Sequence, residues 1–80
     1  MTEQQIQSKR IKELEELGYY VIKLIQTNKN GIPDLILIPQ NSDVEFIEVK
    51  KANGKISKLQ EYRIEELKEH GLKVTVHKGL

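Results

Sequence analysis

The chain has 80 residues, no cysteine, 38% hydrophobic and 31% charged residues, and a net charge of +1 at pH 7. This composition excludes disulfides, thiolate metal sites and a disordered chain, and the length suits one small folded domain over residues 1–80. The longest apolar run is far shorter than the ~20 residues that span a bilayer, so we expect no membrane contact and a cytoplasmic location.

The first predicted element is a helix over residues 3–17. Thr2 and Gln5 fit a capping box at its start, and Gly18 ends it. The apolar positions at helical spacing, which should face the core, are Ile6, Ile11, Leu14 and Leu17. Glu3 falls on the same side, where it either interacts favourably with the helix dipole or reaches into a site.

Three strands are predicted next, over residues 19–25, 33–38 and 44–50. Aromatic and β-branched residues indicate the first. The second contains an unbroken apolar run, which indicates a strand covered on both faces and therefore central in the sheet. Pro33 is tolerable at its start, where the ladder of hydrogen bonds has barely begun. A polar turn over residues 39–43 joins the second strand to the third.

A second capping box, Ser57 with Gln60, predicts a helix that extends to about residue 70 and ends at Gly71. Gln60 shares the apolar stripe of this helix, so its polar side chain needs a partner. A last strand follows over residues 72–77. The helix joins the third strand to the last as a crossover, which favours parallel pairing of these two strands.

The candidate site lies on the second and third strands. Asp34 stands at the start of one, and alternation places Glu48 and Lys50 on one face of the other. Asp34 and Glu48 offer hard oxygen ligands for Mg²⁺ or Mn²⁺, and the Val49 carbonyl offers a third. Lys50 is placed to orient or deprotonate a water or to hold a phosphate oxygen, and Gln60 to hydrogen-bond the water or a ligand carboxylate. The pattern indicates a metal-dependent nuclease.

Taken alone, this pattern also arises by chance. A strand with alternating charges can lie at a sheet edge, where Glu48 and Lys50 would simply face solvent. What favours a site is the larger set of segments around it, which resembles the VRR-NUC family of the PD-(D/E)XK nuclease superfamily. The segments of this resemblance, which spans the chain from Glu3 to Val74, are Glu3, Gly31 to Asp34, Phe46 to Lys50, Gly54 to Ser57, and Gln60.

The resemblance implies an α/β, restriction-endonuclease-like core in the order αβββαβ, with a mixed sheet flanked by helices. It also implies that Asp34 and Glu48 bind the metal, that Lys50 is the catalytic lysine, that Gln60 belongs to the following motif, and that Glu3 is the acid of the first helix. Stand-alone members of this size are similar to phage and bacterial proteins that cut branched DNA and resemble Holliday-junction resolvases. A homodimer would match the two equivalent strands of a four-way junction.

Basic residues outnumber acidic ones between residues 50 and 63. The candidate contacts to nucleic acid are Lys29, Lys51, Lys55, Lys58 and Arg63. A lysine-rich loop and helix start that are merely solvated explain the same charges. Two further alternatives stay open, a non-catalytic nucleic-acid-binding module on a nuclease fold and a small protein-interaction domain.

Overall fold

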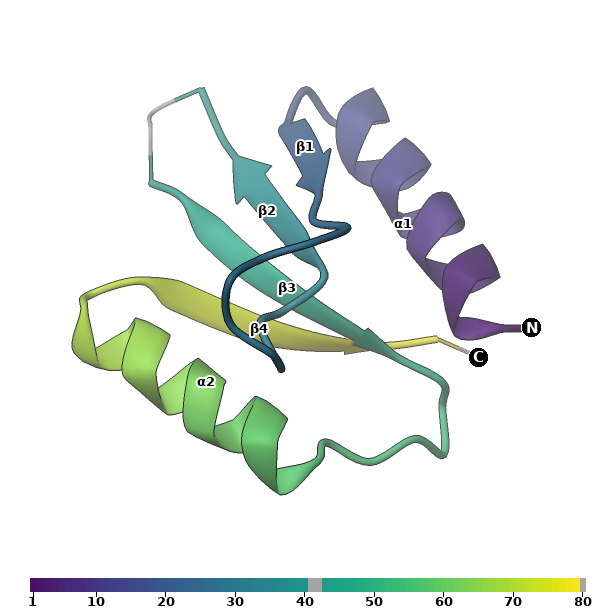
Figure 1. The fold of residues 1–80 in the computed structure, drawn as a ribbon. Coiled ribbons are helices and arrows are strands. Elements are labelled where there is room, and N and C mark those ends of the chain that lie inside the picture. Colours follow the sequence, from purple (N-terminus) through teal and green to yellow (C-terminus); the bar gives the residue numbers. More distant parts are fainter. Residues whose placement is uncertain (41–42, 80) are drawn as a thin grey trace.

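A four-stranded mixed sheet has one helix on each face (Figure 1). The structure is a computed structural model that describes residues 1–40 and 43–79. Asn41 and Ser42, which belong to the predicted turn, lie outside the described residues. In chain order the elements are α1 (Glu3–Glu16), β1 (Tyr20–Lys23), β2 (Leu35–Ile38), β3 (Glu45–Lys50), α2 (Lys58–Glu69) and β4 (Lys73–Lys78). The predicted α/β order is confirmed.

The strands lie in the order β1-β2-β3-β4. β1 pairs with β2 and β2 with β3 in antiparallel fashion, while β3 and β4 are parallel. The parallel pairing follows from the α2 crossover, as the sequence predicted. β2 is an inner strand, also as predicted. None of the described helices is long and apolar enough to cross a membrane.

The main core lies between α1 and one face of the sheet. Its buried side chains are Ile6, Leu14, Leu35, Leu37, Ile47 and Val49. The predicted inward position of Leu17 is wrong, because this residue is 72% exposed. α1 ends at Glu16, so Leu17 is the residue that caps the end of the helix, and Gly18, with a φ of 93°, turns the chain directly after it.

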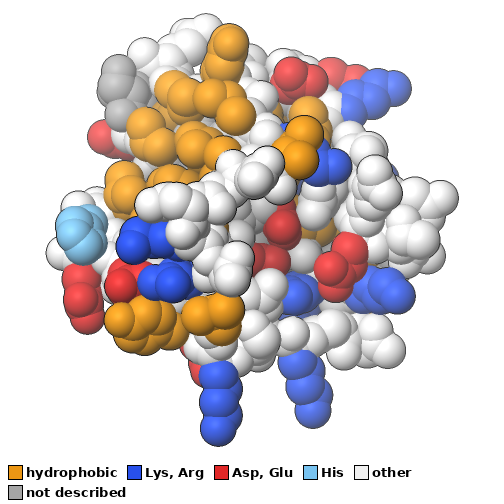
Figure 2. Space-filling model, in the orientation of Figure 1, with side chains coloured by type: hydrophobic (Ala, Val, Ile, Leu, Met, Phe, Trp, Pro, Cys, Tyr) orange, Lys and Arg blue, Asp and Glu red, His pale blue; other side chains and the backbone are white. Residues whose placement is uncertain are grey.

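The other face of the sheet is only partly covered. α2 packs against β4, with Ile64 buried beneath it. Apolar side chains remain visible over β1 and β2 on this face (Figure 2). β1 is shorter than the strand predicted over residues 19–25, and Tyr20, one of the aromatic residues in it, is 69% exposed. Tyr20 is exposed because no helix covers this end of the sheet.

Candidate active site

Asp34 lies directly before β2 and is bonded to the neighbouring strand. Its Oδ2 accepts a hydrogen bond from the backbone N–H of Val49 at 2.9 Å. Its own backbone carbonyl accepts from Leu24 N at 2.8 Å. The side chain is therefore fixed between β2 and the end of β3, beside residue 48.

Glu48 is the one buried acidic residue among the described residues, with 1% of its surface exposed. Its Oε2 accepts a hydrogen bond from Gln60 Nε2 at 3.5 Å and lies 4.0 Å from Lys50 Nζ. Its Oε1 is buried and has no hydrogen-bond partner. A buried oxygen left without a partner is costly, so its presence indicates that something else is meant to contact it.

The two carboxyl groups influence each other strongly. The pKa of Glu48 is raised from 4.5 to about 8, chiefly by burial and then by Asp34, which accepts a hydrogen bond from Glu48 only when Glu48 is protonated and whose charge repels the ionised form. Lys50 lowers this pKa and Glu3 raises it, both by smaller amounts. Two carboxylates that close together repel each other unless a proton or a cation lies between them.

A third oxygen points to the same place. The N–H and C=O groups of one strand residue point to the same neighbouring strand. Since the Val49 N–H is directed at Asp34, the Val49 carbonyl is directed there too. The observed antiparallel pairing ends at Leu35 and Ile47; the same register extended by two residues would set Pro33 opposite Val49, and proline has no N–H to donate to the Val49 carbonyl.

These oxygens fit a hard divalent cation. In residues 1–40 and 43–79, no three His, Cys, Asp or Glu side chains come together as metal ligands. A cation here would therefore use two carboxylates, from Asp34 and Glu48, with the Val49 carbonyl and water. Oxygen ligands with several retained waters are what Mg²⁺ and Mn²⁺ accept, and the unpartnered Glu48 oxygen gives them a place to bind.

Gln60 has two roles at the start of α2. Its Oε1 accepts from Ser57 N at 3.0 Å, which completes the predicted capping box. Its Nε2 donates to Glu48, so the partner that the sequence required for Gln60 is the buried carboxylate. Lys50, on the same face of β3 as Glu48, completes the group of side chains that the fold brings together.

Glu3 lies farther from the centre of the site. It is half-buried in the first turn of α1, and its charge contributes to the raised pKa of Glu48. The structure therefore places Glu3 within electrostatic range of Glu48 but outside its direct contacts. The role that the resemblance gives to Glu3 stays a prediction.

The basic candidates fall into two groups. Exposed side chains are those of Lys29, Lys51, Lys55 and Lys58. Figure 2 shows basic side chains around the lower part of this face, next to acidic ones near its centre. Arg63 differs from the lysines, because its guanidinium is bonded to Asn30 and Glu66.

One feature near the site was not indicated by the sequence. The loop between β1 and β2 bends into a hollow of about 300 Å³, lined by residues from Leu24 to Asp34. Its lining ends at Asp34, so this hollow lies directly beside the candidate site. The chain turns at Gly31, where φ is 85°. Apart from this glycine, no local pattern in the sequence indicates the hollow.

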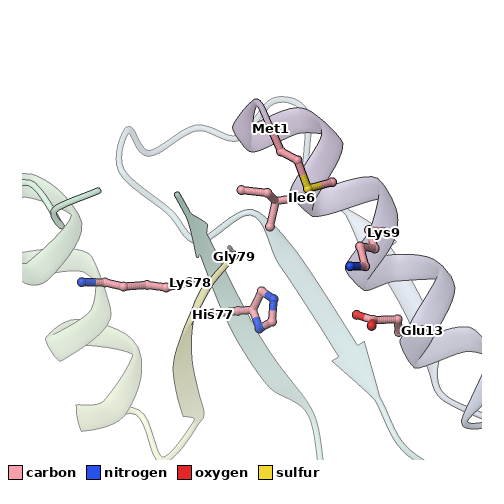
Figure 3. A pocket seen from close by; sticks show the side chains of 7 residues that line it. All are labelled: Met1, Ile6, Lys9, Glu13, His77, Lys78 and Gly79. Carbon is pink, nitrogen blue, oxygen red and sulfur yellow. The ribbon is translucent and has the colours of Figure 1, made fainter. Parts of the chain in front are cut away.

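A second hollow, of about 160 Å³, lies between α1 and the end of β4 (Figure 3). Its lining residues are Met1, Ile6, Lys9, Glu13, His77, Lys78 and Gly79. Burial and the charge of Arg10 lower the pKa of His77, which Glu13 partly offsets. None of the candidate catalytic residues lines this hollow.

The family model and the solved structures that match the chain carry one domain name. The family model of the VRR-NUC domain matches residues 1–79. A solved structure named VRR_NUC domain is 31% identical with a TM-score of 0.85, covering 96% of this chain and 84% of that chain. Another, named VRR_NUC domain protein, is 25% identical with a TM-score of 0.82, covering 99% and 79%. No curated protein matches the chain. These likenesses confirm the fold predicted from the sequence.

Proposed function

The chain belongs to the VRR-NUC domain family, and on this premise we propose that it is a Mg²⁺- or Mn²⁺-dependent endonuclease that cuts branched DNA. The observation that supports this most strongly is the buried, unpartnered Oε1 of Glu48 beside the carboxylate of Asp34. A module that only binds nucleic acid would gain nothing from two carboxylates placed next to phosphate.

Asp34, Glu48 and the Val49 carbonyl would hold the cation. When bound, it supplies positive charge at the scissile phosphate and lowers the pKa of a water. The Asp34 carboxylate is held for this by the Val49 N–H, and Glu48 by the Gln60 amide. These hydrogen bonds orient both ligands before substrate arrives, which preserves the geometry on which phosphoryl chemistry depends.

Lys50 contributes a positive charge to the site. Its Nζ lies 4.0 Å from Glu48 Oε2, on the face that a phosphate must approach. From there it can donate to a phosphate oxygen and stabilise the charge that develops as water attacks phosphorus and the leaving oxygen departs. The exposed side chains of Lys29, Lys51, Lys55 and Lys58 bind the flanking phosphates.

The active form is a homodimer, which places one site on each of two equivalent strands of a four-way junction. The second copy covers the apolar side chains left open on β1 and β2, of which Tyr20 and Ile22 are exposed. An apolar patch can contact its own copy across a two-fold axis, and a small domain gains stability when that surface is buried. Light scattering after size exclusion gives the mass of two chains, and Tyr20→Lys gives the mass of one. Leu17→Lys, at an equally exposed residue that caps the end of α1, leaves the dimer intact.

The activity test uses a labelled four-way junction and a linear duplex of the same sequence, each with Mn²⁺. We expect the junction to be cut in preference to the duplex. Asp34→Asn and Lys50→Ala each reduce cleavage by roughly 10²–10³-fold, as removal of a group that stabilises the transition state does. Asp43→Asn and Lys68→Ala are matched controls at exposed positions away from the site, and they retain activity.

Each part of the proposal can fail separately. Equal cutting of junction and duplex contradicts the preference for branched DNA. Full activity of Asp34→Asn contradicts the site. Salt-sensitive binding of the junction together with no Mn²⁺ binding by calorimetry favours the non-catalytic binding module instead.

A further inference from the structure

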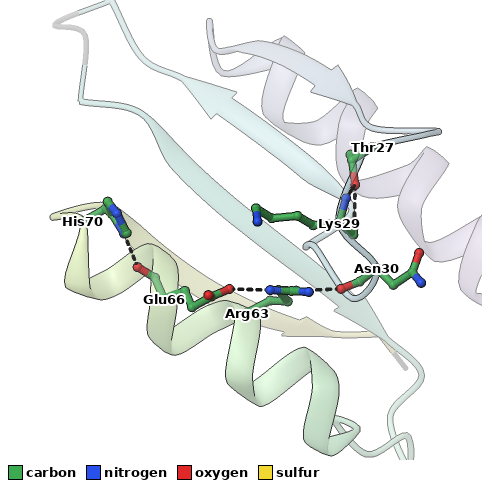
Figure 4. Close-up of polar contacts among 6 residues, drawn as sticks. All are labelled: Thr27, Lys29, Asn30, Arg63, Glu66 and His70. Carbon is green, nitrogen blue, oxygen red and sulfur yellow. Dashed lines mark hydrogen bonds and ion pairs between the residues drawn. The ribbon is translucent and has the colours of Figure 1, made fainter.

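The loop that precedes Asp34 is bonded to α2 (Figure 4). Arg63 Nε donates to the backbone carbonyl of Asn30 at 2.9 Å. Arg63 Nη1 donates to Glu66 Oε1 at 2.7 Å, which holds the guanidinium in place from its other side. The Arg63 side chain is only 18% exposed, so the guanidinium fills the space between the loop and the helix.

Close packing joins the same two segments one residue further along. A Cβ at Gly31 would lie 2.8 Å from Leu59 Cγ and 3.3 Å from the Leu59 backbone carbon. Gly31 also has a φ of 85°, which a side chain rarely permits. Leu59 and Gln60 are adjacent in the first turn of α2, so this packing fixes the position of that turn.

Among the described residues, two further contacts position α2. Along its length it packs against β4. Toward the site, its first turn reaches Glu48 through the Gln60 amide, at the long distance of 3.5 Å. A bond of that length is weak, so it cannot by itself hold the helix start in register with β3.

We propose that Arg63 is a positioning residue that fixes Gln60 relative to Glu48 by holding α2 on the segment that ends in Asp34. This inference rests on the proposed function. It assigns to Arg63 a role different from the phosphate contact that charge alone suggested. The loop contacts α2 at Asn30 and Gly31, and α2 contacts Glu48 through Gln60. Together these contacts set the distances among the Asp34 carboxylate, the Glu48 carboxylate and the Gln60 amide.

The surroundings of Arg63 disfavour a phosphate at this position. Its Nε and Nη1 already donate to protein oxygens. The Glu66 carboxylate, whose pKa is lowered chiefly by its hydrogen bond to Arg63, would repel an incoming phosphate. The guanidinium carbon also lies 5.3 Å from the centre of the Tyr62 ring, so one of its flat faces is partly occupied.

The test compares Arg63→Gln with Arg10→Gln, since Arg10 also pairs with a glutamate three residues later but lies on α1, not on the helix that is bonded to the loop. Calorimetry with Mn²⁺ gives the metal affinity of the folded proteins, checked by circular dichroism. We expect Arg63→Gln to bind Mn²⁺ about 10-fold more weakly, because groups that orient metal ligands typically contribute that much. Arg10→Gln binds Mn²⁺ as the parent does, and Arg63→Lys recovers part of the loss.

Junction binding in EDTA, measured across a series of salt concentrations, separates the two roles. A positioning residue leaves the salt slope unchanged, whereas the loss of a phosphate contact reduces it by about one. Glu66→Gln sharpens this test. It weakens Mn²⁺ binding if Glu66 holds Arg63 in place, and it strengthens junction binding if Arg63 contacts phosphate.

A double-mutant cycle tests the route through Gln60. If Arg63 acts by positioning Gln60, then Arg63→Gln has little further effect on Mn²⁺ affinity in a Gln60→Ala background. Additive losses, or a parent-like affinity of Arg63→Gln, overturn the inference. If the parent protein itself binds no Mn²⁺, the proposed function fails, and this outcome is distinct from the other two.

Discussion

The two faces of β3 carry opposite kinds of side chain. Ile47 and Val49 lie on one face, and Glu48 and Lys50 lie on the other. The first pair packs into hydrocarbon beneath α1. The second pair lies on the α2 side, where a buried carboxylate oxygen has no partner. Neighbouring residues of one strand thus have opposite effects on stability.

This difference shows how an 80-residue domain can support a costly site. Burying the apolar face contributes most of the stability of such a small domain. That contribution offsets the cost of placing Glu48 and Asp34 side by side on the opposite face. Substitutions on the two faces should therefore change stability in opposite directions, and only those on one face should change metal binding.

The largest expected effect on stability is on the apolar face. Ile47→Ala removes a side chain that is buried in the main core and should lower the free energy of unfolding by about 2–5 kcal/mol. Urea denaturation in EDTA measures this change. If Ile47→Ala lowers the free energy of unfolding by less than about 1 kcal/mol, the apolar face is not the main source of stability, and the contrast between the two faces of β3 fails.

Glu48→Gln should have the opposite effect. It removes the buried charge while keeping the shape of the side chain, so in EDTA at pH 8 it should raise the free energy of unfolding by about 1–3 kcal/mol. Mn²⁺ should stabilise the parent protein but not this variant. Glu65→Gln, at an exposed position on α2, is the matched control and should change neither quantity. A less stable Glu48→Gln protein would contradict the proposed cost of the site.

The pH dependence of the metal-free protein gives an independent measurement of the same cost. The pKa of Glu48 is raised from 4.5 to about 8 in the folded chain, so the native state retains a proton that the unfolded chain releases. Stability from this group is complete below pH 4.5 and is lost as the pH rises toward 8. We expect denaturation midpoints in EDTA to fall over this range in the parent and to fall less in Glu48→Gln.

The sequence predicted the elements well because most of their signals are local. The capping boxes at Thr2 and Ser57 are both present. Alternation placed Glu48 and Lys50 on one face of β3, which the structure confirms. The failures came at element ends. Leu17 and Tyr20 have the right residue type for packing, but whether a neighbouring element covers them is decided by tertiary structure.

Local sequence patterns could not predict every contact in the site. The proximity of Asp34 to Glu48 was predicted from the order of the strands and from the family resemblance. The bond from Arg63 to Asn30 joins residues 33 positions apart, and no periodicity signals it. Charge alone grouped Arg63 with the exposed lysines, whereas its neighbours in space set it apart.

The smallest effect, and the sharpest comparison, comes from the two capping-box glutamines. Gln5 in α1 and Gln60 in α2 accept from the cap backbone N–H at 2.9 Å and 3.0 Å, in the same local motif. Replacement by alanine should therefore cost each helix a similar amount, about 0.5–1 kcal/mol, by urea denaturation. Because only Gln60 also donates to Glu48, only Gln60→Ala should weaken Mn²⁺ binding, by roughly 10-fold. The two glutamines share the capping motif and differ in the contact of Gln60 with Glu48. Equal Mn²⁺ affinities for the two variants would therefore mean that Gln60, like Gln5, only caps its helix.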